Sequence, residues 1–307
     1  MPPVWKLSSD WFAPFHQRLE GLGFSFEDRP AQLFLARAKG ISVNLYASGT
    51  VLINGSDGDA MRKVEAILEE FGGHRTDGSR PAPDAIEAVT GTRIGTDESG
   101  KGDYFGPLVV AGVLVTPEAG EKLRAIGVRD SKKLSDARIA TMAPRIREAV
   151  GAACFHELAI PPEEYNRLYD PLQGIGALLG WAHAQVIETL LAKGPPCDLS
   201  VADQFGDDRH IKRHLGERGR KLRLLQTPKG ERDLAVAAAS VLARDVFVRS
   251  LHAMGEKWSV EFPKGSSQVV DAGVRFVRDH GFEALGKVAK VHFTTTGKIM
   301  AESRPRV

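Results

Sequence analysis

Two adjacent acidic residues, Asp97 and Glu98, lie in the stretch IGTDESGKGDYFGP, directly after a short apolar segment. Carboxylates held close together destabilise each other's ionised form, whereas a divalent cation stabilises both. The pair is therefore a candidate metal site. A simpler interpretation is that the two acids are exposed turn residues that carry no chemistry.

The same stretch partly matches the nucleotide-binding pattern G-x-x-x-x-G-K-[ST] at Gly95, Gly100 and Lys101. In such a loop a Ser or Thr hydroxyl binds Mg²⁺, and a helix follows whose N-terminus faces the phosphates. Gly102 has no hydroxyl, and Pro107 with the β-branched run after it predicts a strand. Two acids in the loop would also repel phosphate, so the sequence favours the carboxylate pair.

Further acids occur where other predicted elements begin or end. Asp203 ends the apolar segment SVAD, and Glu231 and Asp233 precede a helix rich in alanine. A small-residue helix packs closely on a sheet, and open α/β sheets bind ligands at the carboxyl ends of their strands. Three acidic element ends in one domain suit Mg²⁺, which binds carboxylate and water oxygens.

A mixed sheet covered by helices is predicted to position these acids. Apolar or alternating runs predict strands at 92–96, 108–115, 197–203 and 221–227. Helical patterns predict helices at 135–150, 174–192 and 233–254. Residues 74–92, HRTDGSRPAPDAIEAVTGT, are typical of a linker.

A small α+β unit is predicted before this linker. SSDWFAPFHQRLEGLG predicts a capped helix, ISVNLYASGTVLINGS two strands around the turn Ser48-Gly49, and SDGDAMRKVEAILEEFGG a second capped helix. About 75 residues are few for an enzyme but ample for a binding module. We place the domain boundaries at 1–85 and 86–307.

Charge is unevenly distributed, although the net charge is only +2. Residues 1–73 carry seven Lys/Arg and nine Asp/Glu, whereas Arg209 to Arg223 holds seven Lys/Arg against one Glu. The basic segment is either a solvated surface or a patch that follows nucleic-acid phosphates. The sequence leaves both open.

The chain is expected to be cytoplasmic and not to bind a membrane. Its longest apolar runs are far shorter than the ~20 residues that span a bilayer, and its first residues, MPPVWKLSSDWF, contain no apolar signal-peptide core. The two cysteines, Cys154 and Cys197, have no C-x-x-C or His companion, so neither disulfides nor a zinc site is expected.

Taken in order, seven motifs resemble type 2 ribonucleases H over about residues 90 to 300. They are GTDESGKGDYFGPLVVAGV, DSKKLS, YN, ADQF, LAVAAASVLAR, FPKG and KVHFTTT. DYFGP, DQF and VAAAS resemble the ribonuclease HIII branch, and VNLYASGTVLINGSDG resembles its N-terminal TBP-like substrate-binding domain. The resemblance implies an α/β fold, with an RNase H-like mixed sheet flanked by helices and a small N-terminal α+β (TBP-like) domain.

The resemblance also implies an endonuclease that cuts the RNA strand of RNA–DNA hybrids with Mg²⁺ or Mn²⁺. Asp97, Glu98 and Asp203 match the first three acidic positions of the family, which are catalytic and bind the metal. The fourth acid of the family would fall at Gly230, where this sequence departs from the pattern. We assign this role to Glu231, one residue later, and keep Asp233 as the alternative.

Substrate contacts are expected around the acids. Glycine turns let backbone groups approach a ribose 2′-hydroxyl, so Gly100-Lys101-Gly102 is expected to distinguish RNA from DNA, unless it is only a tight turn with an exposed lysine. Lys132 and Lys133 are expected to face phosphates, although simple solvation is the alternative. Tyr165, in the YN motif, is expected to contact the substrate.

Three functions follow as hypotheses. The first is a hybrid endoribonuclease that uses two metal ions ~3.5–4 Å apart, with Asp97 bridging them and no obligate protein partner. Its N-terminal domain would bind the hybrid, with Tyr46 or Phe34 stacking on bases. The second is a hybrid-binding protein whose catalytic site is impaired by the displaced fourth acid. The third is a metal-dependent phosphatase.

Overall fold

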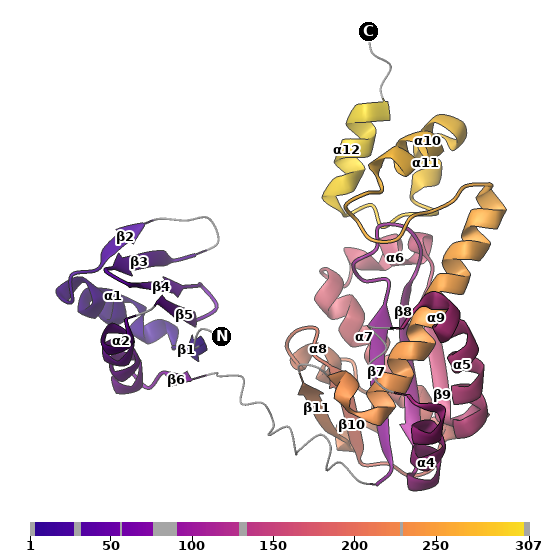
Figure 1. The fold of residues 1–307 in the computed structure, drawn as a ribbon, viewed down its shortest axis with the longest axis horizontal. Coiled ribbons are helices and arrows are strands. Elements are labelled where there is room, and N and C mark those ends of the chain that lie inside the picture. Colours follow the sequence, from indigo (N-terminus) through magenta and orange to yellow (C-terminus); the bar gives the residue numbers. More distant parts are fainter. Residues whose placement is uncertain are drawn as a thin grey trace. The chain divides into compact units, whose positions relative to one another are not determined.

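The structure is a computed structural model that describes residues 4–27, 32–55, 57–75, 91–128, 134–227 and 230–303. The chain divides into two compact units, Met1–Ala82 and Pro83–Val307 (Figure 1). Each unit contains its own buried hydrophobic residues, so each is described by itself. Most of the predicted linker lies outside the described residues.

The smaller unit is an antiparallel sheet with two helices. Its strands are β1 (Val4–Lys6), β2 (Ser25–Glu27), β3 (Phe34–Ala38), β4 (Ile41–Leu45), β5 (Thr50–Gly55) and β6 (His74–Arg75), in the order β2-β3-β4-β5-β1-β6. The helical elements are η1 (Ser9–Trp11), α1 (Phe12–Gly21) and α2 (Gly58–Glu70). The predicted hairpin around Ser48-Gly49 is confirmed as β4 and β5, and Asp57 caps α2 through two backbone N–H groups.

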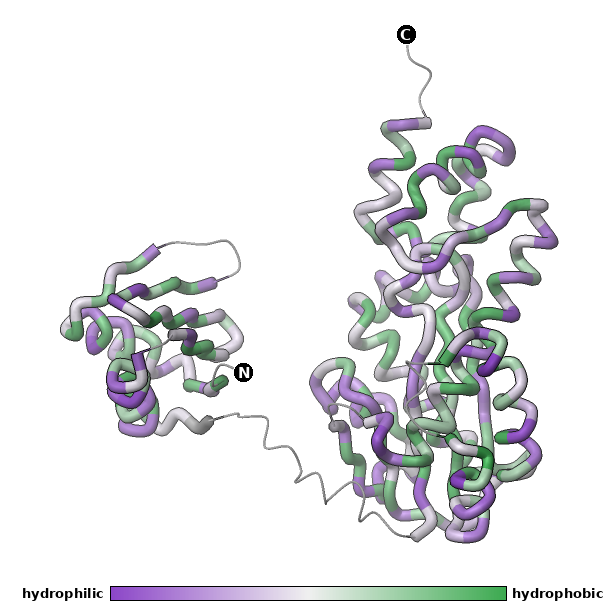
Figure 2. Tube along the Cα trace, in the orientation of Figure 1, coloured by the Kyte–Doolittle hydropathy of each residue, from purple (hydrophilic) through white to green (hydrophobic). Residues whose placement is uncertain are grey.

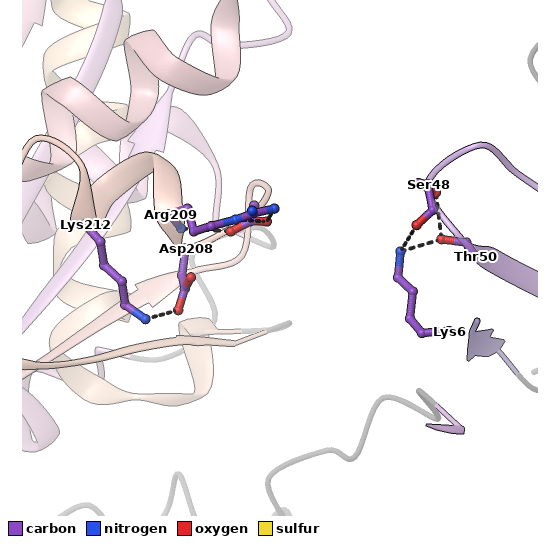
Figure 3. A network of polar contacts seen from close by, with 7 residues as sticks. Lys6, Ser48, Thr50, Asp208, Arg209 and Lys212 are labelled. Carbon is purple, nitrogen blue, oxygen red and sulfur yellow. Dashed lines mark hydrogen bonds and ion pairs between the residues drawn. The ribbon is translucent and has the colours of Figure 1, made fainter. Parts of the chain in front are cut away.

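The side chains of Lys6 and Phe34 help to hold the smaller unit together. Lys6 Nζ donates to the Ser48 carbonyl at 3.1 Å and to Thr50 Oγ1 at 2.8 Å, which ties β1 to the turn before β5 (Figure 3). Phe34 is a core residue that is only 6% exposed. The expectation that Phe34 stacks on bases is therefore wrong for this conformation, because its ring is used for packing.

The larger unit is built on a mixed sheet in the order β11-β10-β7-β8-β9. Its strands are β7 (Arg93–Ser99), β8 (Leu108–Val115), β9 (Phe155–Ile160), β10 (Leu199–Asp203) and β11 (Arg223–Thr227). Strand β10 runs parallel to β7 and β11, whereas β8 is antiparallel to both of its neighbours. The predicted fold class, a mixed sheet flanked by helices with a small N-terminal α+β unit, is confirmed.

Helices cover both faces of this sheet (Figure 1). They are α4 (Pro117–Ile126), α5 (Asp136–Val150), α6 (Pro162–Tyr169), α7 (Ile175–Lys193), α8 (Arg209–Lys212), α9 (Leu234–Trp258), α10 (Val270–His280), α11 (Phe282–Leu285) and α12 (Thr294–Ser303). Short 3₁₀ turns occur at η3 (Ala152–Cys154), η4 (Gly219–Lys221) and η5 (Gly230–Arg232). The predicted helices at 135–150, 174–192 and 233–254 correspond to α5, α7 and α9.

Strand β8 lies between two hydrophobic cores of the larger unit. It is buried on both faces, and its side chains alternate between the two helix layers. Val109, Ala111 and Val113 pack in the core with α9 and α5, whereas Val110 and Leu114 pack in the core with α7. Figure 2 shows hydrophobic residues gathered through the centre of this unit.

Two glycines bring the helices unusually close to the sheet. A Cβ at Gly95 would lie 2.2 Å from the Ala235 carbonyl carbon and 2.2 Å from Val236 N, at the start of α9. A Cβ at Gly112 would lie 2.5 Å from a Val186 methyl group on α7. The side-chain-free backbone at these points allows the start of α9 and the middle of α7 to pack near the acid-bearing strand.

By length and composition alone, helix α7 could cross a membrane. The short uninterrupted apolar runs of the sequence did not predict such a helix. In the structure it packs against the sheet, and ten of its residues are buried. These include Leu178, Val186 and Ile187, which share a core with β8. We therefore interpret α7 as a core helix.

Candidate active site

The acid pair lies within strand β7, which continues to Ser99. The expectation that the strand ends at Thr96 and delivers the acids into a turn is corrected, because Asp97, Glu98 and Ser99 still pair with β8. Successive side chains of a strand point to opposite faces. Asp97 therefore faces the α9 layer, and Thr96 and Glu98 face the α7 layer.

Strands β7 and β10 bring the acids of two separate motifs to one cavity of about 290 Å³. Because these strands are parallel neighbours, their carboxyl ends meet at one edge of the sheet. The cavity is lined by Asp97, Glu98, Ser99, Gly100, Lys101, Gly102, Asp203, Ser240 and Arg244. The structure thus brings together the first three predicted acids and the predicted glycine turn.

Asp97 is 5% exposed, and this burial raises its pKa from 3.8 to about 8. The nearby charges of Glu98 and Asp203 contribute to this rise of the pKa, while a hydrogen bond from Ser240 opposes it. Its Oδ1 also accepts the backbone N–H of Glu98 at 2.8 Å. A carboxyl group in this position ionises readily only when a positive charge is present.

Glu98 has the opposite pKa shift. Burial acts to raise its pKa, but contacts with His183 and Lys101 outweigh burial and lower it. His183 Nε2 lies 3.3 Å from Glu98 Oε2, and Lys101 Nζ lies 3.4 Å from Glu98 Oε1. Glu98 is therefore held as a carboxylate, beside an Asp97 that favours its protonated form.

Asp203 is held at the end of β10 by Gly230, the position at which the resemblance placed the family's fourth acid. The Gly230 N–H donates to Asp203 Oδ1 at 2.8 Å. A Cβ at Gly230 would lie 2.8 Å from Asp203 Cα, so this backbone leaves no room for a side chain there.

The two candidates for the fourth acid lie in different surroundings. Asp233 is 1% exposed and caps α9, accepting from the Ala235 N–H at 2.8 Å and from the Val236 N–H at 3.2 Å. Its other oxygen accepts from Arg93 Nε at 2.6 Å, which the sequence did not predict. Glu231 lies in η5, is half-buried and does not line the cavity.

The two glycines of the turn after β7 differ in how much space a side chain would have at their positions. Gly100 has φ +86°, and a Cβ there would lie 2.2 Å from the Pro107 carbonyl oxygen and 2.8 Å from the Phe247 ring. Nothing lies within 4 Å of a Cβ built on Gly102. Gly100 is therefore required for internal packing, and only the open backbone of Gly102 matches the expectation of a close substrate approach.

Tyr165 has no exposed surface, which corrects the expectation that it contacts the substrate. Its ring packs against Tyr169 and His292, and Lys290 Nζ lies 5.7 Å from the ring centroid. Lys290 is itself buried and donates to the carbonyls of Asp103 at 2.9 Å and Gly106 at 2.7 Å. This part of the chain therefore supports the loop that follows the acids.

Lys132 and Lys133 lie outside the described residues. The basic segment beginning at Arg209 is described, and part of its charge is neutralised by the acids before it. Arg209 pairs with Asp207 and Lys212 pairs with Asp208, each at 2.6 Å (Figure 3). These two ion pairs compensate two of the seven basic residues of the segment.

Three functional candidates were missed by the sequence reasoning. Ser240 and Arg244 line the cavity from α9. Their spacing of four residues places them on one helix face, a signal that was present in the motif VAAASVLAR. His183 is a single histidine in an apolar helix, and only the strand register of Glu98 reveals its role.

The donor set suits a hard divalent cation. Asp97, Glu98 and Asp203 offer carboxylate oxygens, and the buried Oε2 of Glu98 has no hydrogen-bond partner. In the part of the chain that the structure describes, no group of three or more His, Cys, Asp or Glu side chains is arranged as a complete metal site. Such a partial set fits Mg²⁺-like ions, which keep several waters and bind substrate phosphates.

Comparisons with known proteins agree with this geometry. Residues 94–296 match the family described as ribonuclease HII. Ribonuclease HIII of Chlamydia pneumoniae is 36% identical over 97% of this chain and 99% of its own length, and that of Protochlamydia amoebophila is 36% identical over 92% of each. The crystal structure of Bst-RNase HIII in complex with Mn²⁺ matches with a TM-score of 0.67 and 27% identity over the full length of both chains.

Proposed function

Because the chain belongs to the ribonuclease HII family and is similar along nearly its whole length to ribonucleases HIII, we propose that it is an endoribonuclease that cuts the RNA strand of RNA–DNA hybrids. The reaction depends on a divalent metal ion, and we propose Mg²⁺ or Mn²⁺. The observation that carries the proposal is the meeting of Asp97, Glu98 and Asp203 around one cavity at the strand ends.

The acids divide the work of binding metal and orienting phosphate. When bound, a pair of divalent ions supplies charge stabilisation to the attacking and departing oxygens. Asp97 would serve as the ligand shared by both ions, because it lies on β7, the central strand of the sheet. Glu231 is the fourth acid, since the carboxylate of Asp233 already accepts hydrogen bonds from Arg93 and from the first backbone N–H groups of α9.

The substrate lies along the open side of the cavity. The exposed backbone of Gly102 faces a ribose 2′-hydroxyl, and Lys101 and Arg244 face the phosphates beside the scissile bond. Lys132 and Lys133 contribute further phosphate contacts. The smaller unit, 1–85, binds the hybrid outside the cavity and raises its local concentration.

The test is cleavage of an RNA strand, fluorescently labelled and annealed to DNA, resolved on a denaturing gel. Cutting is expected with Mg²⁺ or Mn²⁺ and is absent with EDTA, with a DNA duplex and with an RNA duplex. Hybrid binding without metal-dependent cutting would favour the alternative, a hybrid-binding protein with an impaired catalytic site. Its support is that Glu231 does not line the cavity.

We further propose that the enzyme acts in the cytoplasm without an obligate protein partner. Both cysteines are free thiols, which is typical of a reducing compartment. Purified protein alone should therefore cut the hybrid, and a requirement for a second protein would contradict this part of the proposal.

A further inference from the structure

We propose that His183 is a positioning residue, which holds the Glu98 carboxylate in the orientation that binds metal by linking it to Thr96. The inference deepens the proposed function, because it concerns the same acidic cavity. None of the residues that line the cavity comes from α7. Through His183, this helix nevertheless affects the affinity of the site for metal.

The register of β7 makes this link possible. Thr96 and Glu98 are two residues apart, so their side chains leave the same face of the strand about 6 to 7 Å apart. His183 lies against that face from α7. Its Nδ1 is 2.8 Å from Thr96 Oγ1, and its Nε2 is 3.3 Å from Glu98 Oε2.

The chemistry of the partners assigns the ring protons. An ionised carboxylate only accepts hydrogen bonds, so the nitrogen that faces it carries a proton. Nε2 of His183, which lies 3.3 Å from Glu98 Oε2, therefore carries the proton, and Nδ1 accepts the hydroxyl proton of Thr96. One hydroxyl thus fixes the ring orientation, and the ring fixes the carboxylate.

The surroundings leave His183 no other polar role. The side chain is fully buried, and the ring of Phe205 stacks on it with centroids 4.8 Å apart. Among the described residues, neither His183 Nε2 nor Glu98 Oε2 has a hydrogen-bond partner, and the two atoms lie 3.3 Å apart. A histidine that only filled space would not need its nitrogens placed between two polar side chains of one strand.

The test compares Mn²⁺ affinity of full-length variants by titration calorimetry. His183→Phe keeps an aromatic ring against Phe205 but removes both nitrogens. Loss of a group that orients a metal ligand typically weakens metal binding about 10- to 100-fold. His183→Gln, whose amide nitrogen can reach the position of Nε2, should recover part of that affinity, and Thr96→Val should weaken binding by a smaller factor.

Two controls separate positioning from general damage. Ser200→Ala changes a buried residue of β10 whose hydroxyl has no hydrogen-bond partner among the described residues, and it should leave the Mn²⁺ dissociation constant unchanged. Hybrid affinity in EDTA should also be unchanged in His183→Phe, because the substrate does not touch the ring.

Wild-type Mn²⁺ affinity in a folded His183→Phe protein would overturn the inference, as would the absence of any recovery in His183→Gln. If His183→Phe does not fold, Thr96→Val decides, and unchanged metal affinity there would overturn the inference. A wild-type protein that binds Mn²⁺ but does not cut the hybrid would instead contradict the proposed function and leave the comparison of affinities valid.

Discussion

Asp97 and Glu98 are adjacent in the sequence but have different chemical environments. Asp97 faces the α9 layer, where burial and neighbouring carboxylates raise its pKa, and Glu98 faces the α7 layer, where His183 and Lys101 lower its pKa. Pairs of titratable groups with divergent pKa values are frequent at catalytic sites. The alternation of side chains along one strand is sufficient to create this difference.

Asp97→Asn should abolish cleavage while hybrid binding remains. Removal of a bridging ligand costs several kcal/mol of charge stabilisation, on the order of a thousandfold in rate. The gel assay and a hybrid titration in EDTA measure the two effects separately. Metal-dependent cutting near the wild-type rate would contradict the assignment of Asp97.

Metal affinity should increase with pH. The pKa of Asp97 is raised from 3.8 to about 8, so the folded metal-free protein retains a proton that the unfolded chain releases, and stability falls as pH rises between these values. A divalent cation must displace this proton. Mn²⁺ should therefore bind up to about tenfold more tightly per pH unit as pH approaches 8. Calorimetry at a series of pH values measures this, and a flat profile would argue against a protonated Asp97.

Glu231→Gln and Asp233→Asn should have different effects. Glu231→Gln should keep the melting temperature of the larger unit and lose turnover. Asn also caps helices well, but Asp233→Asn leaves Arg93, which is 7% exposed, without its charged partner. Breaking a buried pair costs about 3–5 kcal/mol, so this variant should melt earlier and retain turnover where it is folded.

Thermal melts and single-turnover rates at a temperature where both proteins are folded would distinguish these outcomes. If Asp233→Asn loses turnover while folded and Glu231→Gln does not, the fourth acid is Asp233. The expected loss of stability in Asp233→Asn rests on the Arg93 contact, which only the structure reveals.

At the scale of elements, the strongly patterned segments were predictable. The apolar run of β8 and the small-residue pattern of α9 fixed the type of element, and Gly and Asp residues fixed several ends. Strands β1 to β3, β6 and β9 and helices α4, α6, α8 and α10 to α12 were not predicted, and all of them except α10 have ten residues or fewer. The end of β7 was placed too early, since polar residues there continue the strand pairing with β8.

The meeting of Asp97, Glu98 and Asp203 at one cavity was predictable from their types and from their positions near the carboxyl ends of strands. Their support was not. The contacts of His183 with Thr96 and of Arg93 with Asp233 join residues 87 and 140 positions apart, and only the assembled fold reveals them.

Gly95→Ala should disrupt the interface between β7 and α9. The added methyl group would overlap backbone atoms of Ala235 and Val236, which cannot move without shifting the helix start. Overpacking of this kind costs about 1–3 kcal/mol or more. Gly102→Ala, where the added carbon meets nothing, is the matched control and should not change the melting temperature. Equal melting temperatures for both variants would show that α9 adjusts freely.

At the scale of the whole molecule, a fragment beginning at residue 86 should fold and retain metal-dependent cleavage. Its hybrid affinity should fall by on the order of tenfold or more, because the tethered binding unit is lost. Residues 1–73 are net negative, so the lost contribution comes from a local face, with Tyr46 as a candidate for stacking, more than from bulk charge. An unchanged dissociation constant at matched salt would contradict this role.

The separate hydrophobic cores of the two units also affect how stability is defined for this chain. A free energy of unfolding describes one cooperative transition between two states, and proteins of several domains commonly depart from this scheme. Heating the full chain is therefore expected to produce two heat-absorption peaks, one for each unit. The midpoint that reports on β7 and α9 is that of the larger unit, and a probe that averages both peaks would dilute the effect of every substitution in the acidic cavity.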